Sequence, residues 1–194
     1  MISTLSKKHN FDIVFDSQKT FRRILEAVSN PVRTVNINEC AEKLFGDHQV
    51  FLAVAMTFLD NEVSFYTCDN SALSNEIEYL TLARQDKLDS ADFVFVSNPN
   101  KIKNVIENAK CGTLSNPHKS ATVIIRNDGE PICQLTFSGP GIDGYVTIQA
   151  TNAVKNAVSL RDMQNYEYPQ GIDLIFASSN GELFAIPRLL SAVQ

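Results

Sequence analysis

The sequence predicts an α/β protein with three layers, in which a mixed sheet lies between helices on both of its faces. In the first half of the chain, short apolar runs that suit strands alternate with helical apolar patterns. In the second half, turn signals join neighbouring strands into hairpins. The strands on either side of Asn180-Gly181 are apolar on both faces, which is typical of a sheet that is covered on both sides.

Helical patterns occur in five places. The first helix can be capped by Asp16 or Ser17 and ends at Pro31, and one face of it carries Phe21, Ile24, Leu25 and Val28. The second, at 50–59 behind Asp47 as its cap, is apolar nearly all round and should be buried. The remaining helices are expected around 73–80, at 102–109 with Gly112 as C-cap, and at 153–163.

Six strands are expected before the C-terminal hairpin, at 32–37, 63–67, 93–96, 121–126, 132–137 and 145–149. The turn signal Asn127-Asp128-Gly129-Glu130 predicts a hairpin between the fourth and the fifth of them.

The C-terminal hairpin is expected to turn on Asn180 and Gly181 alone, because a type I′ turn needs φ > 0 at both central residues. Ser179 then faces Glu182, and the same register places Asp173 opposite Arg188, which we interpret as a structural ion pair. This register sets Phe176 against Ala185 and Ile175 against Ile186. It groups Ile175, Phe184 and Ile186 on one face, and Leu174, Phe176 and Leu183 on the other.

Composition limits the class of function. The 194 residues are 44% hydrophobic and 20% charged, and without a linker or repeat we expect one domain over 1–194. A net charge of −5 speaks against general binding to nucleic acid or to an anionic membrane.

The apolar runs are far shorter than the roughly 18 residues of a membrane span. No apolar segment follows Lys7 and Lys8, so we expect a cytoplasmic protein without a signal peptide. The cysteines lack metal or redox spacing and are expected to be buried free thiols: Cys40, Cys68, Cys111 and Cys133.

Residues 139–144 spell G-x-G-x-x-G after a strand, which is the pattern of a dinucleotide site. Such a site must next open a helix, whereas strand-like residues follow here, and Pro140 lacks an N–H. We therefore favour a glycine turn between strands. An anion-binding nest at Gly139 and Gly141 stays open as the alternative.

Other candidates for ligand or partner contact are few. Arg22 and Arg23 point about 100° apart on the first helix, and Arg22 can pair with Glu26. His118 stands in a loop, where polar residues are often functional. Asp60 is expected to cap the turn after its helix. The three histidines lack metal-ligand spacing and no local nucleophile–base motif is present, so we expect neither a metal site nor a catalytic residue.

Four segments, in order, resemble the PhnH family, the H subunit of the bacterial carbon–phosphorus lyase system for phosphonate breakdown. They are FRRILEAVSNP at 21–31, Leu59-Asp60 before a strand, GPGI at 139–142, and YPQGIDLIFASSNGELFAIPR at 168–188. Three positions depart from the family pattern: Val32 where glycine is usual, His118 where glutamate is usual, and Ser120 where glycine is usual.

The resemblance implies the fold of pyridoxal-phosphate-dependent transferases without the cofactor, and a homodimer. It also implies a core assembly with G, I and J subunits, and action with G, I and L subunits to join a phosphonate to the ribose of ATP. In that setting the chain would position partners and carry no catalytic residue. Two alternatives stay open: a freestanding enzyme that uses the glycine loop as a phosphate site, and an isolated ligand-binding module.

Overall fold

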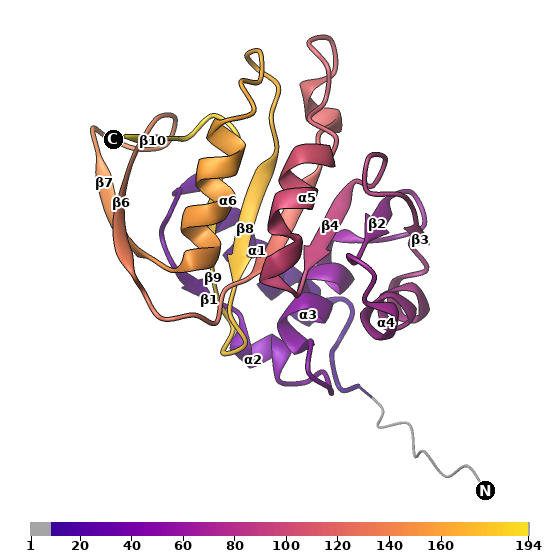
Figure 1. Ribbon diagram of the computed structural model, residues 1–194. Helices are drawn as coiled ribbons and strands as arrows, with labels where there is room; N and C mark the ends of the chain where they lie inside the picture. Colours follow the sequence, from indigo (N-terminus) through magenta and orange to yellow (C-terminus); the bar gives the residue numbers. More distant parts are fainter. Residues whose placement is uncertain (1–8, 194) are drawn as a thin grey trace, which may run out of the picture.

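The computed structural model describes residues 9–193, so Lys7 and Lys8 lie outside the described residues. Its centre is a seven-stranded mixed sheet in the order β1-β9-β8-β5-β4-β2-β3 (Figure 1). The five strands β8, β5, β4, β2 and β3 are parallel, and β9 and β1 complete one side as antiparallel neighbours. The strands are β1 (Val35–Asn36), β2 (Ser64–Tyr66), β3 (Arg84–Gln85), β4 (Phe93–Val96), β5 (Thr122–Arg126), β8 (Asp173–Ala177) and β9 (Glu182–Ile186).

Helices cover both faces of this sheet, as predicted. One hydrophobic cluster joins one face to α1 (Phe15–Ser29), α2 (Asn38–Ala41), α3 (Gln49–Phe58) and α4 (Ser71–Thr81). A second cluster joins the other face to α5 (Ile102–Asn108) and α6 (Asn152–Asp162). Two short 3₁₀ turns, η1 (Pro99–Lys101) and η2 (Pro117–Lys119), lie in the loops on either side of α5.

The chain changes direction between β2 and β4. From β2 it passes through α4 outward to β3, and from β4 it passes through α5 inward to β5. Because these two helices cover opposite faces, the loops after β2 and β4 diverge at the carboxyl ends of the strands. Open α/β sheets generally bind ligands at such a topological switch point.

The predicted hairpin between 121–126 and 132–137 is wrong. β5 belongs to the main sheet, whereas β6 (Cys133–Ser138) pairs with β7 (Val146–Ala150) and β10 (Ser191–Val193) in a separate antiparallel sheet. The turn residues are used elsewhere, because the Asn127 amide oxygen accepts from the Thr151 hydroxyl and the Asp128 carboxylate from the Ser179 N–H. The turn signal therefore marks the exit from one sheet into the other.

The C-terminal hairpin exists, but its register is shifted by one residue from the prediction. Ser178 N–H donates to the Glu182 carbonyl at 2.8 Å, which leaves a three-residue loop with Gly181 at φ 86°. Ile175 consequently faces Ala185, and Phe176 faces Phe184. The two faces differ accordingly. Ile175, Ala177, Leu183 and Ala185 lie toward α1–α4, and Leu174, Phe176, Phe184 and Ile186 lie toward α5 and α6.

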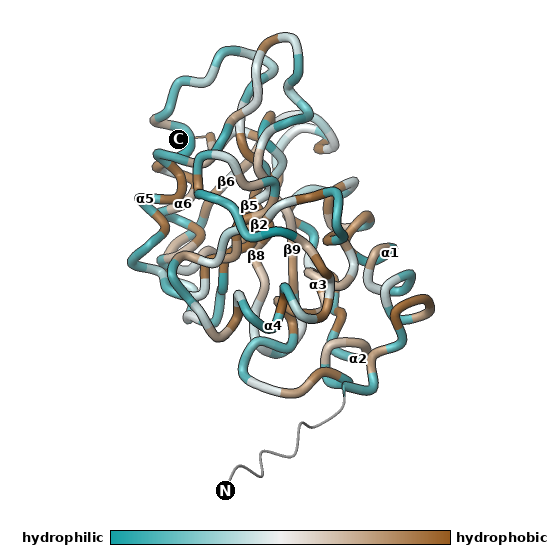
Figure 2. The backbone as a smooth tube through the Cα atoms, turned by 90° about the vertical axis from the view of Figure 1, so that its right-hand side faces the viewer, coloured by the Kyte–Doolittle hydropathy of each residue, from teal (hydrophilic) through white to brown (hydrophobic). Residues whose placement is uncertain are grey.

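The first helix has the expected length but a different cap and a different buried face. Asp12 accepts the N–H groups of Val14 and Phe15 at 2.9 Å, whereas the expected cap Asp16 is buried and binds Lys43 at 2.7 Å. Of its predicted apolar face, Ile24 is buried. Phe21, Leu25 and Val28 are 44%, 50% and 42% exposed. Figure 2 shows hydrophobic stretches along this helix at the periphery of the molecule.

Candidate functional site

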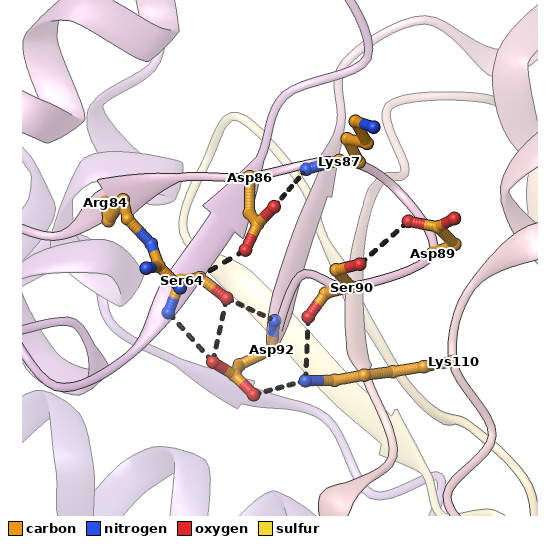
Figure 3. A network of polar contacts seen from close by, with 8 residues as sticks. All are labelled: Ser64, Arg84, Asp86, Lys87, Asp89, Ser90, Asp92 and Lys110. Carbon is orange, nitrogen blue, oxygen red and sulfur yellow. Dashed lines mark hydrogen bonds and ion pairs between the residues drawn. The ribbon is translucent and has the colours of Figure 1, made fainter.

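A polar network at the amino ends of the parallel strands joins Ser64, Asp92 and Lys110 (Figure 3). Asp92 Oδ2 accepts from the N–H and the hydroxyl of Ser64 at 2.8 and 2.9 Å, and Lys110 donates to the other carboxylate oxygen. Burial opposes the charged form of Asp92, but the bonds from Lys110 and Ser64 outweigh it and lower its pKa. Asp92 therefore holds β2 against β4 as an ionised carboxylate, and we interpret the network as structural.

A second network lies at the opposite, carboxyl ends of the strands. We call it the His48–Arg126 cluster: His48, Asn70, Ser97 and Arg126. Asn70 follows β2, Ser97 follows β4, Arg126 ends β5, and His48 immediately precedes α3. Asn70 Nδ2 lies 3.2 Å from Ser97 Oγ and 3.2 Å from His48 Nε2, so these side chains join the loops that follow β2 and β4.

Three contacts fix the guanidinium of Arg126. Nη2 donates to the Asp47 carbonyl and lies 2.9 Å from His48 Nδ1, and Cζ stands 5.3 Å from the centre of the Phe51 ring. Burial, and then the positive charge of Arg126, lower the pKa of His48, so the imidazole is neutral at physiological pH. Arg126 forms a wall shared by two clefts of about 420 and 430 Å³.

The turn after β2 is strained. Cys68 and Asp69 have φ of 53° and 66°, a left-handed conformation that non-glycine residues seldom adopt. Lys101 Nζ binds Asp69 at 3.0 Å and the Tyr66 hydroxyl binds it at 3.1 Å, which holds the turn in place. Strain of this kind concentrates at functional sites, and here it lies beside the His48–Arg126 cluster.

Arg22 and Arg23 line one surface cleft of about 400 Å³ together with Lys19, Asn36 and Glu39. The predicted pairing of Arg22 with Glu26 is wrong, because Arg23 takes that carboxylate at 3.2 Å and Arg33 at 3.4 Å. Lys19 in turn pairs with Glu39 at 2.8 Å. Three of the basic side chains on this part of the surface are thus already bound by carboxylates.

The glycine loop joins β6 to β7, as expected for a turn between strands. A Cβ at Gly141 would lie 2.8 Å from Pro31 Cδ, and one at Gly139 would lie 3.0 Å from the Leu189 carbonyl oxygen. The backbone at these glycines therefore faces protein at close range. His118 is exposed in η2, near the amino ends of the strands, and so lies on the edge opposite the His48–Arg126 cluster.

Asp173 and Arg188 form the expected ion pair in spite of the shifted register. Arg188 Nη2 lies 2.7 Å from Asp173 Oδ2, and the Arg188 N–H donates to Asp173 Oδ1 at 2.8 Å. The guanidinium also donates to the Pro117 carbonyl, which ties the hairpin to the loop that carries His118. This arrangement supports a structural role for the pair. Asp60 caps its turn as expected, by accepting the Glu62 N–H at 2.8 Å.

Asp47 does not cap α3 as predicted: the residue at the N-cap position is His48, and no side chain caps that helix. Gly112, expected as the C-cap of α5, lies beyond the actual cap, Ala109.

All four cysteines are free, but only Cys40 and Cys68 are buried. Burial raises the pKa of the Cys68 thiol to about 12.

Sequence reasoning missed the His48–Arg126 cluster because its members are far apart in the chain. One signal was present: Arg126 follows four residues of an apolar strand, where a charged side chain comes to lie at the carboxyl edge of a parallel sheet. Within residues 9–193, no three His, Cys, Asp or Glu side chains gather as a metal-binding group. No described helix has the length and apolarity needed to cross a membrane.

Comparison with known proteins gives two agreeing results. Residues 9–192 match the model of a family described as bacterial phosphonate metabolism protein PhnH. A protein of Stutzerimonas stutzeri named as a C-P lyase subunit protein, HtxG, is 29% identical over 174 residues, which cover 88% of this chain and 83% of that protein. Because the family match extends over nearly the whole chain, this chain belongs to the PhnH family of bacterial phosphonate metabolism proteins.

Proposed function

We propose that this chain is a dimeric, partner-positioning subunit of a carbon–phosphorus lyase assembly in the cytoplasm. The family match over residues 9–192 carries this proposal. The similarity to a protein named as a C-P lyase subunit supports it. In this role the chain assists other subunits as they form a ribose 1-(alkyl)phosphonate 5-triphosphate from ATP and a phosphonate. Its own part is to hold partners in place.

The exposed side of α1 supports the homodimer. Phe21, Leu25 and Val28 form an apolar stripe on this helix, and three further exposed apolar residues lie at its start: Ile13, Val14 and Phe15. An apolar cavity of about 190 Å³ between Val28, Phe58 and Pro187 adjoins the stripe. Exposed apolar side chains on one helix beside an apolar cavity are typical of an interface, and obligate interfaces bury about 2,000 Å² or more.

Light scattering at micromolar concentration tests the dimer. We expect a dimer for the natural sequence and a monomer for the double variant Phe21→Ser/Leu25→Ser. Tyr79→Ser is the matched control, because Tyr79 is an exposed aromatic residue on α4 and its loss should leave the dimer intact. A natural chain that is strictly monomeric at this concentration would contradict the proposal.

The G, I and J subunits are the proposed partners in the core assembly. Co-expression with a tag on the I subunit should recover this chain in a fixed ratio with all three. If this chain is well folded and yet absent from the recovered complex, the assignment to the assembly is wrong. Parallel recovery of the Phe21→Ser/Leu25→Ser variant reports whether the dimer surface is also used by partners.

The non-catalytic role rests on the lack of a nucleophile–base motif in the sequence, and we also propose that the chain needs neither a metal nor pyridoxal phosphate. The proposed relation to the pyridoxal-phosphate transferase fold concerns the architecture alone. Elemental analysis and a visible absorption spectrum of the purified chain test this.

The alternative, an enzyme with a phosphate site at the glycine loop, is disfavoured because Pro31 lies against Gly141.

A further inference from the structure

We propose that the cleft at the carboxyl ends of β5 and β8 binds a tetrahedral oxyanion of the phosphate or phosphonate kind, with Arg126 as its main contact. The cleft has a volume of about 420 Å³. Its lining includes Phe51, Arg126 and Ala177, together with Gly46 and Asp47 from the loop before α3 and Ser179 from the hairpin turn. Binding at this cleft is a property of the chain itself and does not require other subunits.

The guanidinium of Arg126 is held ready for a ligand. Nη2 is occupied by the Asp47 carbonyl and by His48, and the Phe51 ring supports the guanidinium from one side. Nη1 forms only a long ion pair with Asp128 Oδ2, at 3.8 Å, and this distance is too great for a direct hydrogen bond. A planar guanidinium fixed at one edge presents the N–H groups of its other edge, which is the geometry that binds oxyanions.

The hydrogen bonds around His48 contain more donors than acceptors. Arg126 can only donate, so Nδ1 of His48 must accept and Nε2 must carry the ring proton. Nε2 then points at Asn70 Nδ2, which is also a donor. If the Asn70 amide were turned round, its oxygen would accept from His48 Nε2. Its amide nitrogen would then face the Leu73 N–H, which in the observed orientation donates to Asn70 Oδ1 at 3.1 Å. In either orientation one N–H faces another donor.

An oxyanion on Arg126 would supply acceptors to this donor-rich network while the contacts of Nη2 with Asp47 and His48 stay in place. The other groups at the cleft are compatible with an anion. Ser179 is exposed at the rim, the first turn of α3 has no side-chain cap, and the Asp128 carboxylate is engaged by the Ser179 N–H. Asp47 supplies the one remaining carboxylate on the lining.

Titration calorimetry of the purified full chain in low-salt buffer tests the proposal, with inorganic phosphate as the first probe. We expect saturable binding that weakens about tenfold or more in Arg126→Gln, because a charge-assisted contact is lost. Arg84→Gln is the matched control, since Arg84 is an exposed arginine on the edge strand β3 and its loss should change nothing. Thermal unfolding of each variant shows whether it is folded.

A second variant keeps the test independent of Arg126. Ser179→Asp adds a negative charge at the rim and should weaken phosphate binding to a similar degree without touching the guanidinium. The same titration is repeated with methylphosphonate and with ATP. If methylphosphonate binds more tightly than inorganic phosphate, the site is assigned to a phosphonate; if ATP binds more tightly, it is assigned to a nucleotide phosphate. Absence of binding for all three probes at millimolar concentration, or equal binding by Arg126→Gln and Arg84→Gln, would overturn the inference.

Discussion

Val32 shows how a single residue can combine strain and burial. Its φ is 60°, its side chain is 6% exposed, and its N–H donates to the Ala185 carbonyl at 2.9 Å. A branched side chain in this conformation costs roughly 1–2 kcal/mol. The conformation explains why glycine is usual at this position in the family that the sequence resembles.

We therefore expect Val32→Gly to be nearly neutral, because the relief of strain offsets a large part of the roughly 1.5–3 kcal/mol that burial of valine contributes. Val123→Gly is the control: Val123 is also buried but lies within β5 without strain, and its loss should cost about 3 kcal/mol or more. Urea denaturation of both variants checks this, and equal losses would refute it.

His48 gives a prediction about pH. Burial, and then the charge of Arg126, lower the pKa of His48 below 6.5 in the folded state. Between the two pKa values the imidazole is therefore protonated in the unfolded chain and neutral in the folded chain. The contribution of His48 to stability is therefore present above pH 6.5 and is lost as the pH falls through 6.5 toward the folded-state pKa. Arg126→Gln should raise the pKa of His48 toward 6.5. NMR titration of the imidazole measures it, and an unchanged pKa in the variant would contradict the assigned cause.

Among the elements, the C-terminal hairpin depends on its ion pair. Asp173 and Arg188 are 29% and 21% exposed, so either single alanine variant should destabilise the protein by about 1–3 kcal/mol by leaving a charge half-buried. The double variant should cost less than the sum of the two. Thermal unfolding of the four proteins in this cycle gives the coupling, and strictly additive losses would show that the pair does not hold the hairpin.

The elements also show what the sequence could and could not predict. Alternating patterns were enough for the layers and for the strands β2 and β4. The contact between Asp173 and Arg188 was predicted from the hairpin register, and it forms although that register is shifted by one residue. The predicted hairpin register was wrong because Asn180-Gly181 suits both a two-residue and a three-residue loop. Gly181 packs against Asn38, and such a long-range contact is not visible in the local sequence. The predicted buried face of α1 was wrong because the helix carries both buried and exposed apolar side chains, and periodicity alone does not distinguish them.

For the whole molecule, we expect the purified chain alone to release no adenine from ATP in the presence of methylphosphonate. The described residues do bring Ser64 beside Asp92 and Lys110, but Ser64 is only 3% exposed, and the bonds from Lys110 and Ser64 lower the pKa of Asp92, which makes its carboxylate a poor base for the serine. The measurement is chromatography for adenine, with a mixture that adds the G, I and L subunits as positive control. Release by the chain alone would show that it is an enzyme.

The pairing of β1 with β9 has a consequence for synthesis of the chain. The Asn36 side chain donates to the Asn180 carbonyl, 144 residues further along. At typical elongation rates the ribosome needs roughly 10–30 s to make that stretch. Throughout this interval α1 lacks β9, against which it packs in the folded chain. The unfinished chain therefore exposes Ile24 in addition to Phe21 and Leu25, which are exposed in the folded structure as well. Slow translation or chaperone depletion should therefore lower the yield of this subunit more than its folded stability alone would indicate.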